Sequence, residues 1–121
     1  RPSGNNLIDL FAYLIRKYGR MDTSEYARIM QLKTSELRGA ILAIGGMSAM
    51  EWRNRYLLLE AQELMERTDM SITAIAAKLG FSQPSVFSKF FRTLTKSQPW
   101  EWRIEKKKPG SNRKRTYHCY E

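Results

Sequence analysis

The chain contains two copies of one short layout, and this repeat restricts its fold more than any other feature. Each copy places a helix-capping residue, a small alanine and a large apolar residue at intervals of five. These residues are Asp22, Ala27 and Leu32 in the first copy and Ser71, Ala76 and Phe81 in the second. A further apolar residue follows in each copy, Leu37 and then Phe87, where the spacing between copies grows from 49 to 50 residues. The repeat predicts a fold made of two similar units.

Each copy predicts a short helix, a tight turn and a second short helix. The alanine lets the second helix cross the first closely, and the tight turn sets the helix-turn-helix angle of about 90–120°. The outer face of the second helix then stands clear of the body, where it fits a major groove about 12 Å wide. Two such units on one rigid helix would present recognition helices to successive major-groove faces, about 34–36 Å apart.

Apolar residues at helical spacing predict an all-α fold, in agreement with the small number of breakers, 7 glycines and 4 prolines in 121 residues. We expect helices over residues 7–18, 34–43 and 48–67. A further helix is expected to start at Asp22, which forms a capping pair with Glu25. Three more are expected after the caps Ser71 and Ser82 and after Pro99. The expected core includes several large side chains, among them Trp52, Leu59, Trp100 and Trp102.

These elements divide the chain into five segments. We expect a linker-like or disordered N-terminus at residues 1–6, a first helix-turn-helix unit at 7–47 and a linker helix at 48–67. The second helix-turn-helix unit is expected at 68–103, followed by a basic, flexible tail at 104–121.

The chain is basic, with a formal net charge of +9. Residues 104–121 hold six basic and two acidic residues, so the first 103 residues carry +5. A basic protein attracts polyanions, nucleic acid first and anionic membrane second. There is no apolar run of the roughly 18 residues that a transmembrane helix needs, and the single Cys119 allows no internal disulfide. We therefore expect a cytoplasmic nucleic-acid-binding protein without membrane association.

The second unit carries a dense, ordered set of motifs. It contains Ile75-Ala76, Leu79-Gly80-Phe81-Ser82, Phe87-Ser88-Lys89-Phe90-Phe91-Arg92 and Pro99-x-x-x-Arg103. These motifs strongly resemble the Ile-Ala pair, Gly-Phe-Ser turn, Phe-Ser-Arg-x-Phe-Lys recognition helix and closing Pro-x-x-aromatic-Arg of the AraC/XylS family of bacterial transcription regulators. The resemblance covers about residues 7–103.

The resemblance implies a seven-helix domain with two helix-turn-helix units joined by a long helix. It also implies promoter binding to double-stranded DNA and, usually, activation through contact with RNA polymerase. The family often carries a separate sensing or dimerising domain, and nothing in these residues resembles one.

The first unit departs more from the family pattern than the second. Gly46-Met47-Ser48 agrees with it, but the pattern expects Ser near Lys33 and Phe-Lys near Ile41-Leu42. Leu57 stands where the long helix usually has an arginine, and Lys96 replaces the glycine after the second recognition helix. We expect these departures to leave the fold unchanged. We also expect the first unit to read less of the DNA sequence because of them.

The outward face of the second recognition helix supplies the main DNA candidates. Glutamine bonds adenine, lysine reaches guanine acceptors and valine meets a thymine methyl group. The base candidates are Gln83, Ser85, Val86 and Lys89. The phosphate candidates, which position the protein without specifying sequence, are Arg92, Lys78 and Lys96.

The first recognition helix offers a weaker set. Its outward residues are Thr34, Ser35, Glu36, Arg38 and Gly39. Thr34, Ser35 and Arg38 are base candidates, and Arg38 is the basic one. Glu36 would accept a hydrogen bond from cytosine N4 but would repel nearby phosphates. We expect the first unit to dock mainly on the DNA backbone.

Other function classes fit the sequence less well. An enzyme is not expected, because we find no nucleophile–base set, no phosphate-binding glycine loop and no carboxylate pair on one helix face. No cofactor or metal is expected either, since the neighbours His118 and Cys119 are too few ligands for a metal site. A non-specific architectural nucleic-acid binder fits the charge, although it needs no paired recognition helices. A protein-interaction module that keeps the fold fits the weak first recognition helix.

Overall fold

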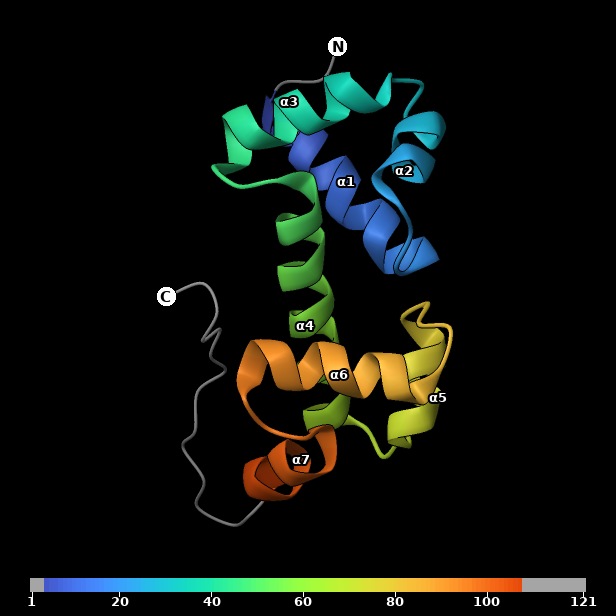
Figure 1. Cartoon of the computed structure of the whole chain (residues 1–121), viewed down its shortest axis with the longest axis vertical. Helices are drawn as coiled ribbons and strands as arrows, with labels where there is room; N and C mark the ends of the chain where they lie inside the picture. Colours follow the sequence, from blue (N-terminus) through green and yellow to red (C-terminus); the bar gives the residue numbers. More distant parts are fainter. Residues whose placement is uncertain (1–3, 108–121) are drawn as a thin grey trace. The chain divides into compact units, whose positions relative to one another are not determined.

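A computed structural model describes residues 4–107 of the chain. Across these residues the chain forms seven α-helices and no strands, so the all-α prediction is confirmed (Figure 1). The helices are α1 (Gly4–Tyr18), α2 (Thr23–Ile29), α3 (Thr34–Gly45), α4 (Ala49–Arg67), α5 (Ile72–Lys78), α6 (Pro84–Thr95) and α7 (Pro99–Lys107). None of the helices in this range combines the length and the apolar character that crossing a membrane requires.

Three helices are longer than expected from the sequence, and one of them, α3, ends at Gly45 instead of residue 43. Helix α1 begins at Gly4, within the segment expected to be a linker. Helix α7 continues to Lys107, and the ammonium groups of Lys106 and Lys107 lie 3.7 Å from the carboxylate of Glu66 and 3.4 Å from that of Asp69. The remaining residues of the expected tail, including His118 and Cys119, lie outside the described residues.

The chain divides into two units, of which the first ends at Leu57 and the second begins at Leu58. Helix α4 contributes residues to both. Leu57 and Leu58 are fully buried, whereas Leu59 is 40% exposed, so the prediction of Leu59 in the core is wrong. The physical reason is that each residue turns about 100° around a helix, so three consecutive leucines cannot all face inward.

The first unit is built around an aromatic cluster. The ring of Phe11 lies 5.2 Å from that of Tyr26, edge to face, and 5.4 Å from that of Trp52. Leu37 and Ile41 of α3 are fully buried in the same unit. Helix α3 therefore has one apolar face fixed by α1 and α2, and its opposite face is left outward.

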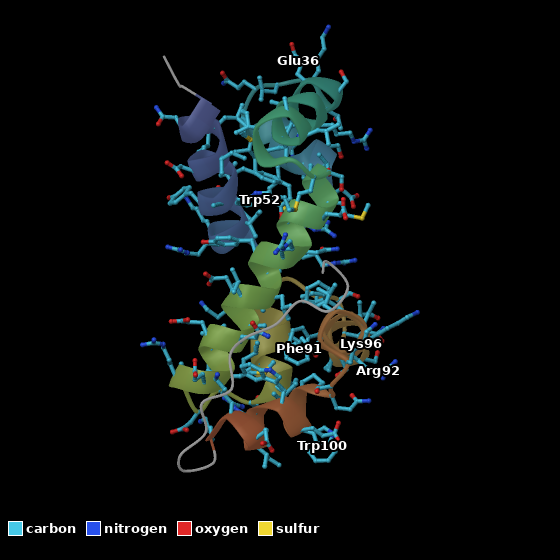
Figure 2. The ribbon with its side chains drawn as sticks, turned by 90° about the vertical axis from the view of Figure 1, so that its left-hand side faces the viewer. Glu36, Trp52, Phe91, Arg92, Lys96 and Trp100 are labelled. Atoms are coloured by element: carbon cyan, nitrogen blue, oxygen red, sulfur yellow. The ribbon has the colours of Figure 1, made fainter. Side chains whose placement is uncertain are left out.

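The second unit has a core of phenylalanine and tryptophan rings. Phe87 and Phe91 of α6 are fully buried, and Phe91 meets Trp102 of α7 edge to face at 5.9 Å. Trp100 is 57% exposed, so its predicted role as a core anchor is wrong. Trp100 and Trp102 are two residues apart on one helix, which places them on nearly opposite faces. Figure 2 shows Trp100 directed away from the helix bundle.

Helix starts agree only in part with the predicted caps. Ser71 caps α5 as expected, since its hydroxyl accepts the backbone N–H of Ala74 at 3.0 Å. Asp22 occupies the capping position of α2, but its side chain makes no capping hydrogen bond. The predicted cap Ser82 is wrong, because Gln83 precedes the first helical residue, Pro84. Proline favours the first position of a helix, and this fixes the start of α6 one residue later than predicted.

Left-handed backbone conformations occur at equivalent places in the two units. Gln31 (φ 61°) and Gly80 (φ 85°) lie in the two helix-turn-helix links, 49 residues apart. Gly46 (φ 75°) and Lys96 (φ 66°) end the two recognition helices, 50 residues apart. The repeat found in the sequence is thus also a repeat of backbone conformation.

Lys96 ends α6 in a strained left-handed conformation, and glycine at this position should relieve the backbone strain. We expect Lys96→Gly to raise the free energy of unfolding by about 0.5–1 kcal/mol, because the left-handed cost of about 1–2 kcal/mol exceeds the extra entropy that glycine loses on folding. Urea unfolding measures the change. Lys96→Ala is the matched control, since it removes the same charge but keeps a Cβ at positive φ. An equal gain in both variants would contradict the explanation by backbone strain.

The hydroxyl group of Tyr26 links the free energy of unfolding to pH. Its buried hydroxyl donates to the carbonyl oxygen of Gly19 and accepts the backbone N–H of Met21 at 3.0 Å. Burial raises the pKa of Tyr26 above its usual 10.0, although the Met21 N–H and the positive charges of Arg53 and Arg20 oppose this rise.

Removal of this hydroxyl should cost stability that depends on pH. At neutral pH, Tyr26→Phe should lower the free energy of unfolding by about 1–3 kcal/mol, because two backbone groups lose their partner. A raised folded pKa gives stability that is complete below pH 10.0 and is lost as pH rises through the folded value. The difference between wild type and variant should therefore shrink above pH 10.0. Tyr13→Phe, at a residue 55% exposed, is the control, and a difference that grows in alkali would refute the prediction.

Candidate nucleic-acid interface

The two helix-turn-helix units share one backbone scheme. In each, a seven-residue helix is followed by a tight link and a twelve-residue helix. The backbone N–H of Leu32 donates to the carbonyl of Ala27 at 2.9 Å, and that of Phe81 donates to Ala76 at 3.0 Å. Both alanines are buried, so the next helix passes close to them. The spacing of cap, alanine and apolar residue thus fixes the turn that presents α3 and α6.

An arginine holds the loop before each helix-turn-helix unit. In the first unit, the guanidinium of Arg53 donates to the carbonyl oxygen of Met21 at 2.7 Å. In the second, Arg103 donates to the carbonyl oxygens of Met65 (3.0 Å), Thr68 (2.9 Å) and Met70. Met21 and Met70 directly precede the capping positions of α2 and α5. These guanidinium groups therefore set where each unit begins.

Arg53 was missed by the sequence analysis, although a plain signal marks it. Glu51-Trp52-Arg53 recurs unchanged as Glu101-Trp102-Arg103, 50 residues later. The two glutamates have the same role, because each accepts the backbone N–H of the residue three before it, at 3.3 Å and 3.2 Å. The sequence repeat thus extends beyond the recognition helices to this tripeptide.

The outward face of α6 is cationic. Gln83, Ser85, Lys89 and Arg92 are exposed, and Val86 is half-buried. Lys78 and Lys96, both exposed, stand at the ends of α5 and α6. No acidic residue lies on α6, and Figure 2 shows Arg92 and Lys96 on its outer side. The structure thus places Ser85, Lys89 and Arg92 on one exposed face of α6, with Gln83 and Lys96 at the two ends of that helix and Lys78 at the end of α5.

The outward face of α3 is nearly neutral. Ser35, Arg38 and Gly39 are exposed, and Thr34 is half-buried. Glu36 is a capping residue, because its carboxylate accepts the backbone N–H of Lys33 at 2.8 Å. The negative charge of Glu36 at the start of the helix offsets the positive charge of Arg38. Helix α3 therefore offers DNA less positive charge than α6 does.

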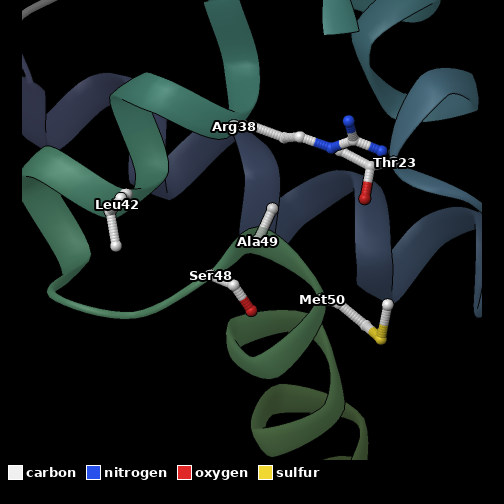
Figure 3. Close-up of a pocket in the computed structure, with 6 residues that line it drawn as sticks. All are labelled: Thr23, Arg38, Leu42, Ser48, Ala49 and Met50. Atoms are coloured by element: carbon white, nitrogen blue, oxygen red, sulfur yellow. The ribbon is translucent and has the colours of Figure 1, made fainter. Parts of the chain in front are cut away.

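A hollow of about 410 Å³ opens beside α3 (Figure 3). Its lining comes from α2, α3 and the start of α4 and consists of Thr23, Arg38, Leu42, Ser48, Ala49 and Met50. The lining is mainly apolar, with Leu42 and Met50 each 58% exposed. The sequence carries no signal for this hollow, because its lining residues are far apart along the chain.

Comparison with known proteins gives the chain its family. A family profile described as "Helix-turn-helix domain" matches residues 26–104. The chain belongs to the AraC/XylS family. The expected resemblance is therefore confirmed, and the family is one of DNA-binding transcription regulators.

One curated relative is the regulatory protein PocR of Salmonella typhimurium, 41% identical over 58 residues. The match covers 48% of this chain and 19% of PocR, so the chain spans about a fifth of that relative's length.

Solved structures share the fold at lower identity. An AraC-type transcriptional regulator from Chromobacterium violaceum is 23% identical, with a TM-score of 0.70 over 88% of this chain and 93% of that one. The DNA-binding domain of AdpA, solved with a target DNA, is 21% identical, with a TM-score of 0.74 over 87% of this chain and 97% of that one.

Loss of Arg103 should destabilise the second unit. We expect Arg103→Ala to lower the free energy of unfolding by about 2–4 kcal/mol, because three partly buried carbonyl groups lose a charged donor. Arg92→Ala, on the exposed face of α6, should change stability by less than about 0.5 kcal/mol. Chemical unfolding followed by circular dichroism compares the two variants. Equal stability losses would show that Arg103 does not hold the loop as described.

Proposed function

We propose that this chain binds specific double-stranded DNA sequences and regulates transcription, with α3 and α6 as recognition helices in successive major grooves. The observation that carries the proposal is the acid-free, cationic outer face of α6, set on a buried apolar face that holds the helix outward. Family membership supports the same function.

The second unit is proposed to supply most of the base readout. Gln83, Ser85, Val86 and Lys89 would contact base edges, where Lys89 has the reach for guanine acceptors. Arg92, Lys78 and Lys96 would neutralise phosphates, which adds affinity without sequence preference. In the first unit, Arg38, Ser35 and Thr34 face outward or lie at the margin of the same kind of face.

Selection of binding sites from random duplex DNA, at two salt concentrations, tests the proposal. Two enriched sequence blocks about one helical turn apart would support reading by both units. A single block would restrict base readout to one of them. Binding with no enriched sequence that disappears as salt rises would contradict specific recognition and favour an architectural binder.

Two variants, Lys89→Ala and Arg92→Ala, distinguish base readout from phosphate contact. Lys89→Ala should cost about 1–3 kcal/mol of discrimination at one base position, because a base contact is lost. Arg92→Ala should weaken binding to all sequences alike and lower the slope of log affinity against log salt by about one. Titrations of fluorescent duplexes over a salt series measure both effects. A uniform loss for Lys89→Ala would reassign this residue to phosphate.

A further inference from the structure

Leu42 is a large apolar residue on the outward face of a recognition helix. It follows Arg38 by four residues and Ser35 by seven, which places the three side chains along one stripe of α3. The opposite stripe holds the fully buried Leu37 and Ile41. Leu42 is 58% exposed and does not belong to the core that buries Leu37 and Ile41. An exposed leucine in line with the proposed DNA contacts calls for a physical explanation.

The equivalent residue in the second unit is Arg92. The backbone N–H of Gly46 donates to the carbonyl of Leu42 at 3.0 Å, and that of Lys96 donates to Arg92 at 2.8 Å. Both pairs end a recognition helix with a left-handed residue, and Leu42 and Arg92 are 50 residues apart. The first unit therefore presents an apolar side chain where the second presents a cation. The side chain of Leu42 can neither neutralise a phosphate nor donate a hydrogen bond to one.

The surroundings of Leu42 are suited to a small apolar group. Leu42, Ala49 and Met50 give the hollow beside α3 its apolar lining, and Figure 3 shows Leu42 on one side of it and Arg38, Thr23 and Met50 on the other. Met50 is unbranched and 58% exposed, so its side chain can adjust to a group that enters. Gly39, one residue after Arg38, has open space where a Cβ would lie, and this lets another surface approach the helix closely.

One base-edge group in the major groove is apolar, the 5-methyl group of thymine. We propose that Leu42, at the hollow that it shares with Ala49 and Met50, contacts the methyl group of a thymine next to the position contacted by Arg38. This inference rests on the proposed function and adds to it a specificity determinant in the first unit. A protein partner is the weaker alternative, because a stable protein interface buries about 800 Å² on each side, far more than six residues around one hollow provide.

Replacement of single thymines by deoxyuridine tests the contact, since it removes the methyl group and nothing else. On the site selected by the wild-type chain, one replacement in the block read by the first unit should weaken binding about fourfold, the loss expected for one buried methyl group. Leu42→Ala should weaken binding to the thymine duplex by a similar factor. The variant should bind the thymine and deoxyuridine duplexes equally.

Ile44→Ala is the matched control variant. Ile44 is also an exposed apolar residue of α3, at 42%, but it does not line the hollow. It should keep the full sensitivity to deoxyuridine. Leu42→Lys, a second variant, should lose this sensitivity and bind all sequences with a steeper salt dependence, because it restores a cation at the position equivalent to Arg92. Circular dichroism melting of each variant separates altered contact from altered folding.

The outcomes separate this inference from the proposed function. Selective binding with no effect of deoxyuridine, or with an effect that Leu42→Ala preserves, overturns the thymine contact and leaves the proposed function standing. Absence of selective binding overturns both. If Leu42→Ala keeps its DNA affinity and methyl sensitivity but loses promoter activation in a reporter assay, the hollow belongs to a protein partner and the inference is wrong.

Discussion

The guanidinium group of Arg103 is the contact on which the second unit most depends. It binds three carbonyl oxygens, at the end of α4 and in the loop that leads to α5, and so fixes where Ser71 can cap that helix. A capped α5 places Ala76 under the link, and the link sets the direction of α6. Through these local steps a charged group on α7 contributes to how the outer face of α6 is presented. Arg53 has the corresponding role in the first unit.

The sequence was sufficient to predict the architecture because the repeat combines three local signals at fixed spacing. A cap, a small residue and an apolar residue each constrain the backbone directly, and Ser71 and Ala76 fulfil these roles. The errors at Leu59 and Trp100 have a different origin. Where apolar residues occur close together on one helix, periodicity does not decide which faces inward, and that choice depends on the ring or chain that packs opposite, as Phe91 does for Trp102.

The site could be predicted less completely than the fold. Outward positions on α3 and α6 follow from the buried ones, so the candidates from Thr34 to Lys96 lie on or beside the expected helices. The hollow near Leu42 depends on residues from three helices whose proximity no sequence spacing shows. Arg53 and Arg103 illustrate the reverse case. Their shared Glu-Trp-Arg tripeptide was visible in the sequence, but its meaning depends on the carbonyl groups that fold around it.

The two units use one backbone plan for two kinds of surface. Lys96 ends α6 in a left-handed conformation that costs a lysine about 1–2 kcal/mol, whereas glycine occupies the same place in the first unit. Backbone strain of this kind often clusters at functional sites, and Lys96 places a cation one turn beyond Arg92, at the end of a helix whose dipole favours positive charge. The first unit has glycine and leucine at these two places, so it is free of this strain and of this charge. Charge on α6 and apolar contact on α3 would then respond differently to salt, and this difference would let one chain combine affinity from one helix with selectivity from the other.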